Sequence, residues 1–90
     1  MNLPIMIEIE AAIVNGLHPD FLAISPVEGT IHVIVSHPSF EHKSIPVRIK
    51  IIYDLINRYN IDILKNNVVI VETFDHEQMT DLLEDALNEV

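Results

Sequence analysis

The sequence predicts a small α+β domain in which a three-stranded mixed sheet packs against helices. Residues 21–27 and 30–36 are rich in apolar and β-branched side chains, and the Glu28-Gly29 turn between them is typical of an antiparallel hairpin. Residues 67–73 form a third β-branched run, and an amphipathic helix at 45–59 precedes it. Because a strand-helix-strand crossover is normally parallel and right-handed, the third strand should run parallel to the second.

The composition indicates one domain spanning residues 1–90. With 49% apolar residues, 21% charged residues and two glycines, the chain can build a packed core and does not have the composition of a disordered tail. The N-terminal stretch has no basic segment, and Glu8 and Glu10 interrupt its apolar run. We therefore expect neither a signal peptide nor a membrane span, and a cytoplasmic location.

Several kinds of chemistry are excluded by residues that the sequence lacks. The chain has no cysteine, which rules out disulfides, thiolate metal sites and cysteine nucleophiles within it. It contains neither a phosphate-binding glycine loop nor a G-x-S-x-G motif, so we do not expect the protein to be an enzyme.

The formal net charge of −9 repels phosphate backbones, which makes nucleic acid an unfavourable partner.

Two periodicities compete in the first element, residues 3–17. Isoleucines alternate as in a strand at Ile5, Ile7 and Ile9. Helical spacing relates four apolar residues, Met6, Ile9, Ile13 and Leu17. We predict a helix, because Asn2 can cap it, Pro4 is tolerated in a first turn and Asn15-Gly16 is a usual C-terminal stop.

The three strands are expected to occupy different places in the sheet. Pro26 cannot donate to a sheet ladder, which places the first strand at an edge. In the second strand Ile31, Val33 and Val35 share one face. The near-continuous apolar run at 67–73 is typical of a strand covered on both faces, so we predict that it is central.

The helix at 45–59 follows a predicted loop at 37–43. Ser44 is its expected N-cap, and Pro46 fits its first turn. Helical spacing predicts an inward face of Ile45, Ile49, Ile52, Leu55, Ile56 and Tyr59. The polar residues expected to face solvent are Arg48, Lys50, Asp54, Asn57 and Arg58. One helical turn around residues 61–64 is an open alternative to a plain connection.

The last helix should begin at Thr73 or Asp75. Its apolar stripe consists of Met79, Leu82, Leu83, Ala86, Leu87 and Val90. Asp75 and Glu77 lie favourably at the positive N-terminal end of this helix. Acids near its C-terminus, namely Glu84, Asp85 and Glu89, oppose the helix dipole, so we expect fraying there.

Positive charge gathers in residues 37–50, HPSFEHKSIPVRIK, which we call the basic segment. Lys43, Arg48 and Lys50 make either a solvated face or a recognition surface for something negative. The positive charge of Lys43 slightly opposes the dipole of the following helix, which favours a functional rather than a stabilising role for this residue. The candidate metal ligands are His32, His37 and His42, although no histidine pair has the i, i+4 spacing of a metal-binding helix and ordinary surface histidines are the favoured interpretation.

The pattern resembles the BolA family over about residues 5–80. A strand ending in Ser36, followed by Phe40-Glu41 and Lys43-Ser44, is similar to the family's V-S-x-x-F-E-G-K-S segment. Arg48 and Lys50 correspond to its R-H-R helix, and the strand ending in Thr73 corresponds to H-A-L-S-L-K-T. The resemblance implies a fold similar to type II KH domains. It also implies a non-enzymatic partner of monothiol glutaredoxins in iron-sulfur cluster or iron handling.

Some positions depart from the family pattern. Asn67 stands where the family carries its cluster-ligating histidine, and the PVEG loop between the first strands offers no second ligand. His42 replaces a family glycine, and Ile49 replaces the helix histidine. Any [2Fe-2S] cluster shared with a glutaredoxin would therefore need His32, His37 or His42 as a substitute ligand. We expect cluster ligation to be impaired or absent.

The resemblance implies a partner-binding set within the basic segment, namely Phe40, Glu41, Lys43, Ser44, Arg48 and Lys50. We expect the chain to be a monomer when alone. The alternative function is a KH-like nucleic-acid-binding or transcription-regulatory module, but the chain lacks the GxxG loop that such domains use and carries Asp62 in the corresponding connection. Dimerisation through an edge strand is a third possibility, which Pro26 disfavours along one edge.

Overall fold

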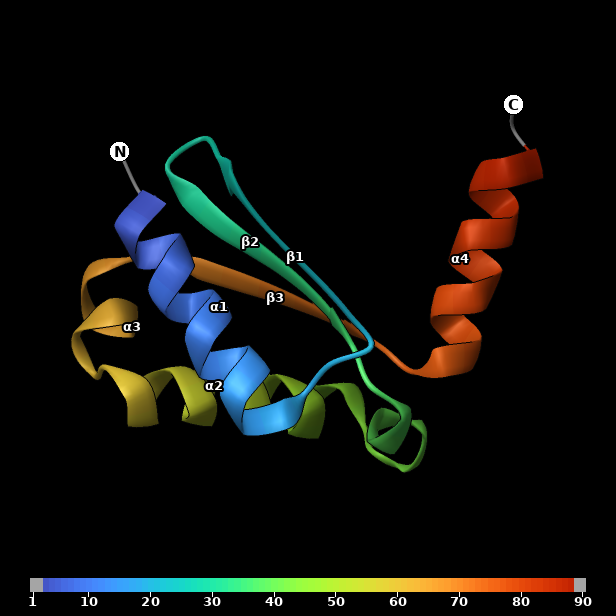
Figure 1. Ribbon diagram of the computed structural model, residues 1–90, viewed down its shortest axis with the longest axis horizontal. Coiled ribbons are helices and arrows are strands. Elements are labelled where there is room, and N and C mark those ends of the chain that lie inside the picture. Colours follow the sequence, from blue (N-terminus) through green and yellow to red (C-terminus); the bar gives the residue numbers. More distant parts are fainter. Residues whose placement is uncertain (1–2, 89–90) are drawn as a thin grey trace.

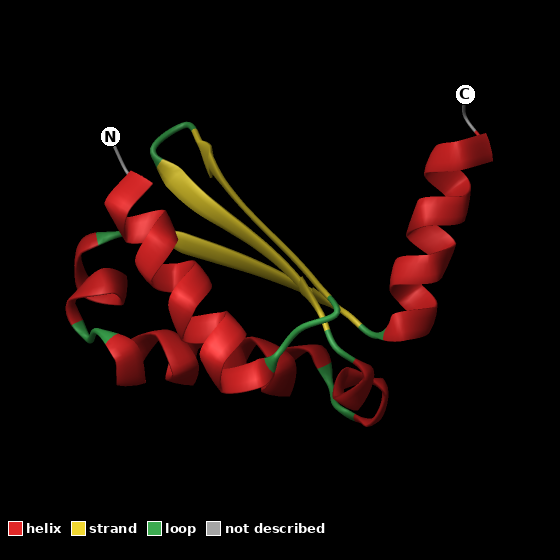
Figure 2. Ribbon diagram, viewed as in Figure 1, coloured by secondary structure: helices red, strands yellow, loops and turns green. Residues whose placement is uncertain are grey.

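The computed structural model describes residues 3–88, in which two helices cover one face of a three-stranded sheet (Figures 1 and 2). In chain order the elements are α1 (Leu3–Leu17), β1 (Phe21–Val27), β2 (Thr30–Ser36), the 3-10 helix η1 (Pro38–His42), α2 (Ile45–Tyr59), α3 (Asp62–Asn66), β3 (Val69–Phe74) and α4 (His76–Asn88). The predicted α+β class is confirmed, and a short helix does follow α2. No helix among the described residues is long and apolar enough to cross a membrane.

The sheet has the order β1-β2-β3, with β1 antiparallel to β2 and β3 parallel to β2. Glu28 and Gly29 both have positive φ angles, 49° and 83°, as a two-residue hairpin turn requires. The prediction that β3 is central is wrong, because β2 lies in the middle and β3 forms an edge. Ile70 and Glu72 of β3 are exposed, so the apolar run there is covered on one face only.

The core lies between the sheet and the layer formed by α1 and α2 (Figure 2). Ile31, Val33 and Val35 project from β2 into this layer, as their alternation predicted. The cluster of buried apolar residues contains Ile9, Ile13, Ile31, Val33, Val35, Phe40, Ile52, Ile56, Ile63, Val69 and Val71. The stretch 3–17 is a helix rather than a strand because Ile9 and Ile13, at helical spacing, reach this core together.

Helix α1 ends later than the Asn15-Gly16 signal predicted. It continues to Leu17, and His18 then adopts a left-handed conformation with φ 54° while its N–H donates to the Val14 carbonyl at 3.1 Å. Gly16 instead faces α2, where a Cβ atom would overlap the side chain of Leu55. The glycine therefore permits the close approach of the two helices, and the expected cap Asn2 lies outside the described residues.

Three expectations about α2 and the segment before it need correction. The predicted loop before it contains η1, and the Ser44 hydroxyl, although at the N-cap position, makes no capping hydrogen bond within residues 3–88. Pro46 does lie in the first turn. Ile45 and Tyr59 were expected to face inward but are 47% and 51% exposed, because the buried stripe of α2 runs through Arg48, Ile52 and Ile56.

Helix α4 projects from the end of β3, away from α1 and α2 (Figure 1). Asp75 precedes its first turn, as predicted. Of the predicted apolar stripe within residues 76–88, only Met79 is buried. Val90 and Glu89, at the end of the predicted helix, lie outside the described residues.

Replacing Ile56 by Val should lower the free energy of unfolding by about 0.5–1.5 kcal/mol, because the wholly buried side chain loses a methyl group and leaves a space. Ile7→Val in α1 is the matched control, since Ile7 is 58% exposed and its change should stay within about 0.5 kcal/mol. Urea unfolding followed by circular dichroism measures both variants. Equal losses would contradict the placement of Ile56 in the core.

Candidate functional site

The basic segment begins where β2 leaves the sheet. The His37 N–H donates to the Phe74 carbonyl at 3.2 Å, which keeps the chain beside the end of β3. His37 then caps η1, since its Nδ1 accepts the Ser39 N–H at 3.0 Å and lies 2.7 Å from the Ser39 hydroxyl. Phe40 points inward and is fully buried. This short helix therefore turns the chain sharply from the sheet into α2.

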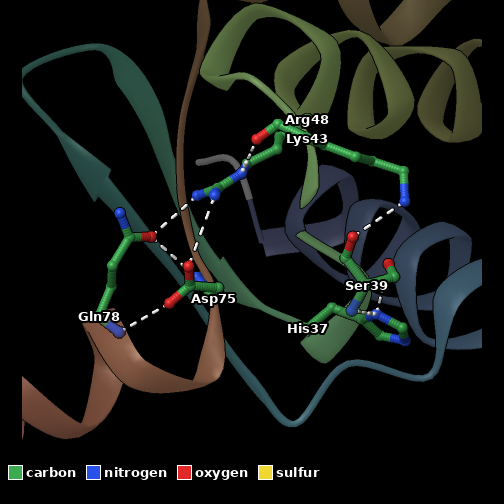
Figure 3. Close-up of polar contacts among 6 residues, drawn as sticks. All are labelled: His37, Ser39, Lys43, Arg48, Asp75 and Gln78. Atoms are coloured by element: carbon green, nitrogen blue, oxygen red, sulfur yellow. Dashed lines mark hydrogen bonds and ion pairs between the residues drawn. The ribbon is translucent and has the colours of Figure 1, made fainter. Parts of the chain in front are cut away.

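Arg48 is buried, with 4% of its surface exposed, so the expectation that it faces solvent is wrong. Its Nε donates to the Lys43 carbonyl and its Nη1 to Gln78 Oε1, each at 2.9 Å (Figure 3). Its Nη2 lies 3.7 Å from Asp75 Oδ2. The guanidinium carbon also lies 5.7 Å from the centre of the Phe40 ring, within the range of a cation-π contact. We call these four residues, Lys43, Arg48, Asp75 and Gln78, the Arg48 network.

Asp75 and Gln78 cap each other's backbone at the start of α4. The Gln78 N–H donates to Asp75 Oδ1 at 2.7 Å, and the Asp75 N–H donates to Gln78 Oε1 at 3.0 Å. This is the reciprocal arrangement of a capping box. Because Arg48 contacts both side chains, the first turn of α4 is fixed to the segment that enters α2.

Several side chains of the basic segment reach the surface around the start of α2. Lys43 is half-buried and its Nζ donates to the Ser39 carbonyl at 2.9 Å, whereas Lys50 is exposed and pairs with Asp54 at 2.8 Å. Between them, Ile45 and Val47 are 47% and 46% exposed. We define the α2-entry surface as Glu41, Lys43, Ser44, Ile45, Val47 and Lys50.

The predicted partner-binding set divides between this surface and the interior. Phe40 and Arg48 are buried, so they position the surface from within. The partner-binding role of Glu41, Lys43, Ser44 and Lys50 stays a prediction. Ile45, which was predicted to face inward, and Val47 were not in the predicted partner-binding set, although their position in the first turn, around Pro46, indicated that this turn begins before the helix reaches the core.

The candidate histidines are separated. His32 is half-buried on the sheet face opposite the helices, His37 caps η1 and His42 is exposed at the end of η1. His32 and His37 are five positions apart along β2 and its continuation, which corresponds to roughly 16 Å at the rise of a strand. Within residues 3–88, no group of three or more His, Asp or Glu side chains could hold a metal ion.

The two positions at which the BolA resemblance locates cluster ligands lie at the hairpin end of the sheet. The Ile31 N–H donates to the Val68 carbonyl at 2.9 Å, which brings Asn67 close to the end of the hairpin. Asn67 Nδ2 donates to the Ile63 carbonyl at 2.9 Å, closing the end of α3. An amide side chain engaged in this hydrogen bond, beside a loop without histidine or cysteine, does not fit the ligand set of a [2Fe-2S] cluster.

Comparison with solved structures identifies the fold. No family model and no curated protein sequence matches this chain. The BolA domain of SufE1 from Arabidopsis thaliana matches with a TM-score of 0.65 at 21% identity, over 79% of this chain and 91% of that one.

Two further structures agree. A bol-like protein from Babesia bovis gives a TM-score of 0.67 at 15% identity, over 84% of this chain and 90% of that one. BolA1 from Arabidopsis thaliana gives 0.64 at 16% identity, over 81% and 93%. The chain therefore has the BolA fold that the resemblance predicted.

Arg48→Met should lower the free energy of unfolding by about 3 kcal/mol, because it removes a buried cation and leaves the mostly buried Asp75 carboxylate without its partner. Arg48→Lys should recover only part of this loss, since an ammonium group cannot reproduce the planar donor geometry. Urea unfolding measures both.

The matched control for this experiment is Lys50→Met, which removes an exposed ion pair. Its effect should stay within about 0.5 kcal/mol. A loss at Arg48 no larger than that at Lys50 would show that the Arg48 network does not stabilise the fold.

Proposed function

We propose that this chain is a non-enzymatic BolA-like protein-interaction module that docks a monothiol glutaredoxin in iron-sulfur cluster or iron handling, without ligating the cluster itself. The BolA fold supports the class of protein. The observation that supports docking without cluster ligation is the Asn67 amide, which caps α3 at the position where the resemblance locates the family's cluster ligand. Docking without ligation is the function that fits both observations.

The α2-entry surface is the docking face in this proposal. Val47 is exposed and lies on the same side of α2 as Lys50, three positions later, so it offers apolar area to bury against a partner. Ile45, two positions before Val47, points to a different side of the helix, toward Phe74 and Leu82. Lys50, near Val47 on α2, and Lys43, just before the helix, suit an acidic rim or the carboxylates of a glutathione held by the glutaredoxin. Their ion-pair and hydrogen-bond partners here, Asp54 and the Ser39 carbonyl, lie on the protein itself and can be exchanged for a partner's oxygen atoms.

The polar contacts at η1 support a non-enzymatic role. Ser39 and His37 approach as a nucleophile and its base would, at 2.7 Å. However, the same Nδ1 atom of His37 already accepts the Ser39 N–H, which makes the pair a local helix cap. The KH-like alternative lacks comparable support, because the connection between α2 and α3 is Asn60-Ile61 followed by Asp62, with no GxxG loop.

Lys43→Glu should weaken binding to a monothiol glutaredoxin roughly three- to tenfold, since reversing a charge at the rim of an interface changes the binding energy by on the order of 1 kcal/mol. Titration calorimetry measures the affinity. Lys43→Gln keeps a donor for the Ser39 carbonyl, so it separates the loss of charge from any change in η1.

Lys65→Glu on α3 is the matched control, because Lys65 is exposed and lies outside the α2-entry surface. It should leave the affinity unchanged. If the changes at Lys43 and Lys65 weakened binding equally, the effect would come from net charge alone, and the proposed docking face would be rejected.

Adding this protein to a cluster-loaded monothiol glutaredoxin should leave the visible absorption and circular dichroism spectra of the cluster unchanged, while amide NMR shifts appear in residues 41–50. The reason is that the protein supplies no cluster ligand at Asn67. A changed cluster spectrum would show that one of its histidines coordinates iron. Absence of amide shifts would reject the partnership itself.

A further inference from the structure

Helix α4 carries an apolar stripe that no other described element covers. Met79 packs at its foot, but Leu82, Leu83 and Leu87 are 47%, 53% and 73% exposed. These residues recur at helical spacing, so they lie on one side of the helix. Figure 1 shows that α4 stands away from α1 and α2 along its length.

The charges on α4 are poorly arranged for a helix that stays alone. Glu77, Asp81 and Asp85 follow one another at i, i+4 spacing, at which like charges repel. Asp85 also lies near the negative C-terminal end of the helix dipole. The sequence has no Lys or Arg after Lys65, so neither residue type is present on α4 to offset these acids. At 13 residues, the helix has about the length at which an isolated helix is marginal.

A groove lies at the foot of this stripe, between α4, the end of β3 and the start of α2. Its volume is about 400 Å³, and its lining includes Ile45, Phe74, Leu82, Asp81 and Asp85. The apolar residues can receive a large aliphatic or aromatic side chain. The two carboxylates at its side favour positive charge next to that side chain.

We propose that the exposed stripe of α4 docks a basic amphipathic helix of a partner protein. Leucines at helical spacing on a helix about 20 Å long match the ridge of another helix. Lys and Arg residues beside that ridge would pair with Asp81 and Asp85, which would remove the like-charge repulsion within α4. This inference goes beyond the proposed glutaredoxin function and does not depend on it.

A second copy of this chain fits the surface less well. Each copy has a formal net charge of −9, and two α4 helices in contact would bring the acids of both together. Like charges placed opposite each other across an interface disfavour binding. The charge of α4 therefore favours a basic partner over self-association.

The experiment uses the whole chain and a synthetic peptide of Leu and Lys, about 18 residues long, with Leu at helical spacing. A peptide with Glu in place of Lys is the control. We expect amide NMR shifts confined to residues 73–88 and the groove, affinity for the Lys peptide only, and weaker binding at higher salt. Shifts centred elsewhere, or equal binding of the Glu peptide, would overturn the proposal.

Matched variants separate a docking site from general attraction between opposite charges. The double change Leu83→Ser with Leu87→Ser should weaken peptide binding about tenfold or more, because it removes exposed apolar contacts without altering charge. Ile61→Ser is its control, since Ile61 is 58% exposed and lies outside α4. Equal effects of the two changes would overturn the proposal.

The acids are tested in the same way. Asp81→Asn with Asp85→Asn should weaken peptide binding several-fold, whereas Glu28→Gln in the hairpin turn should not.

Sedimentation equilibrium of the free protein tests whether a second copy of this chain covers the stripe instead. A monomer supports the proposal, and a dimer that the Leu83→Ser, Leu87→Ser variant abolishes would assign the stripe to a second copy and overturn it.

Discussion

The buried guanidinium of Arg48 is the constraint on which the arrangement of the C-terminal part of the chain depends. Removing an arginine from water is costly unless its charge is paired and its donors are satisfied. Here one carbonyl, one amide oxygen and one carboxylate surround it, contributed by Lys43, Gln78 and Asp75. The fork of N–H groups can meet three partners at once, which an ammonium group could not do in the same plane. The segment before α2 and the start of α4 are thereby joined.

This network explains part of the positive charge in the basic segment. One of its three cations is used inside the protein, where it stabilises the fold rather than presenting a charge to solvent. The other two reach the surface, since Lys50 is exposed three positions after Val47 and Lys43 is half-buried before α2. The α2-entry surface therefore combines apolar and charged residues, whereas the predicted partner-binding set also counted Phe40 and Arg48, which are buried.

Local patterns predicted the long helices and the three strands, but they did not predict η1, the order of the strands or which polar side chains are buried. The spacing of Ile9 and Ile13 and the Glu28-Gly29 turn depend on neighbours in sequence, so the helix and the hairpin could be predicted. The edge position of β3 could not, because an apolar run has the same composition whether the sheet continues beyond it or ends there. The burial of Arg48 depends on Gln78, 30 positions away, which no helical periodicity within α2 reveals.

The Arg48 network also relates the two proposed surfaces to each other. Helix α4 is fixed at one end by Asp75 and Gln78, and the rest of it extends beyond the sheet with its leucines exposed. Ile45, which belongs to the α2-entry surface, also lines the groove at the foot of α4. A partner that shifted Lys43 would move a ligand of the Arg48 guanidinium, and the same guanidinium holds the capping residues of α4. The segment that enters α2 and the first turn of α4, which carry the two proposed surfaces, are therefore joined by one shared set of hydrogen bonds.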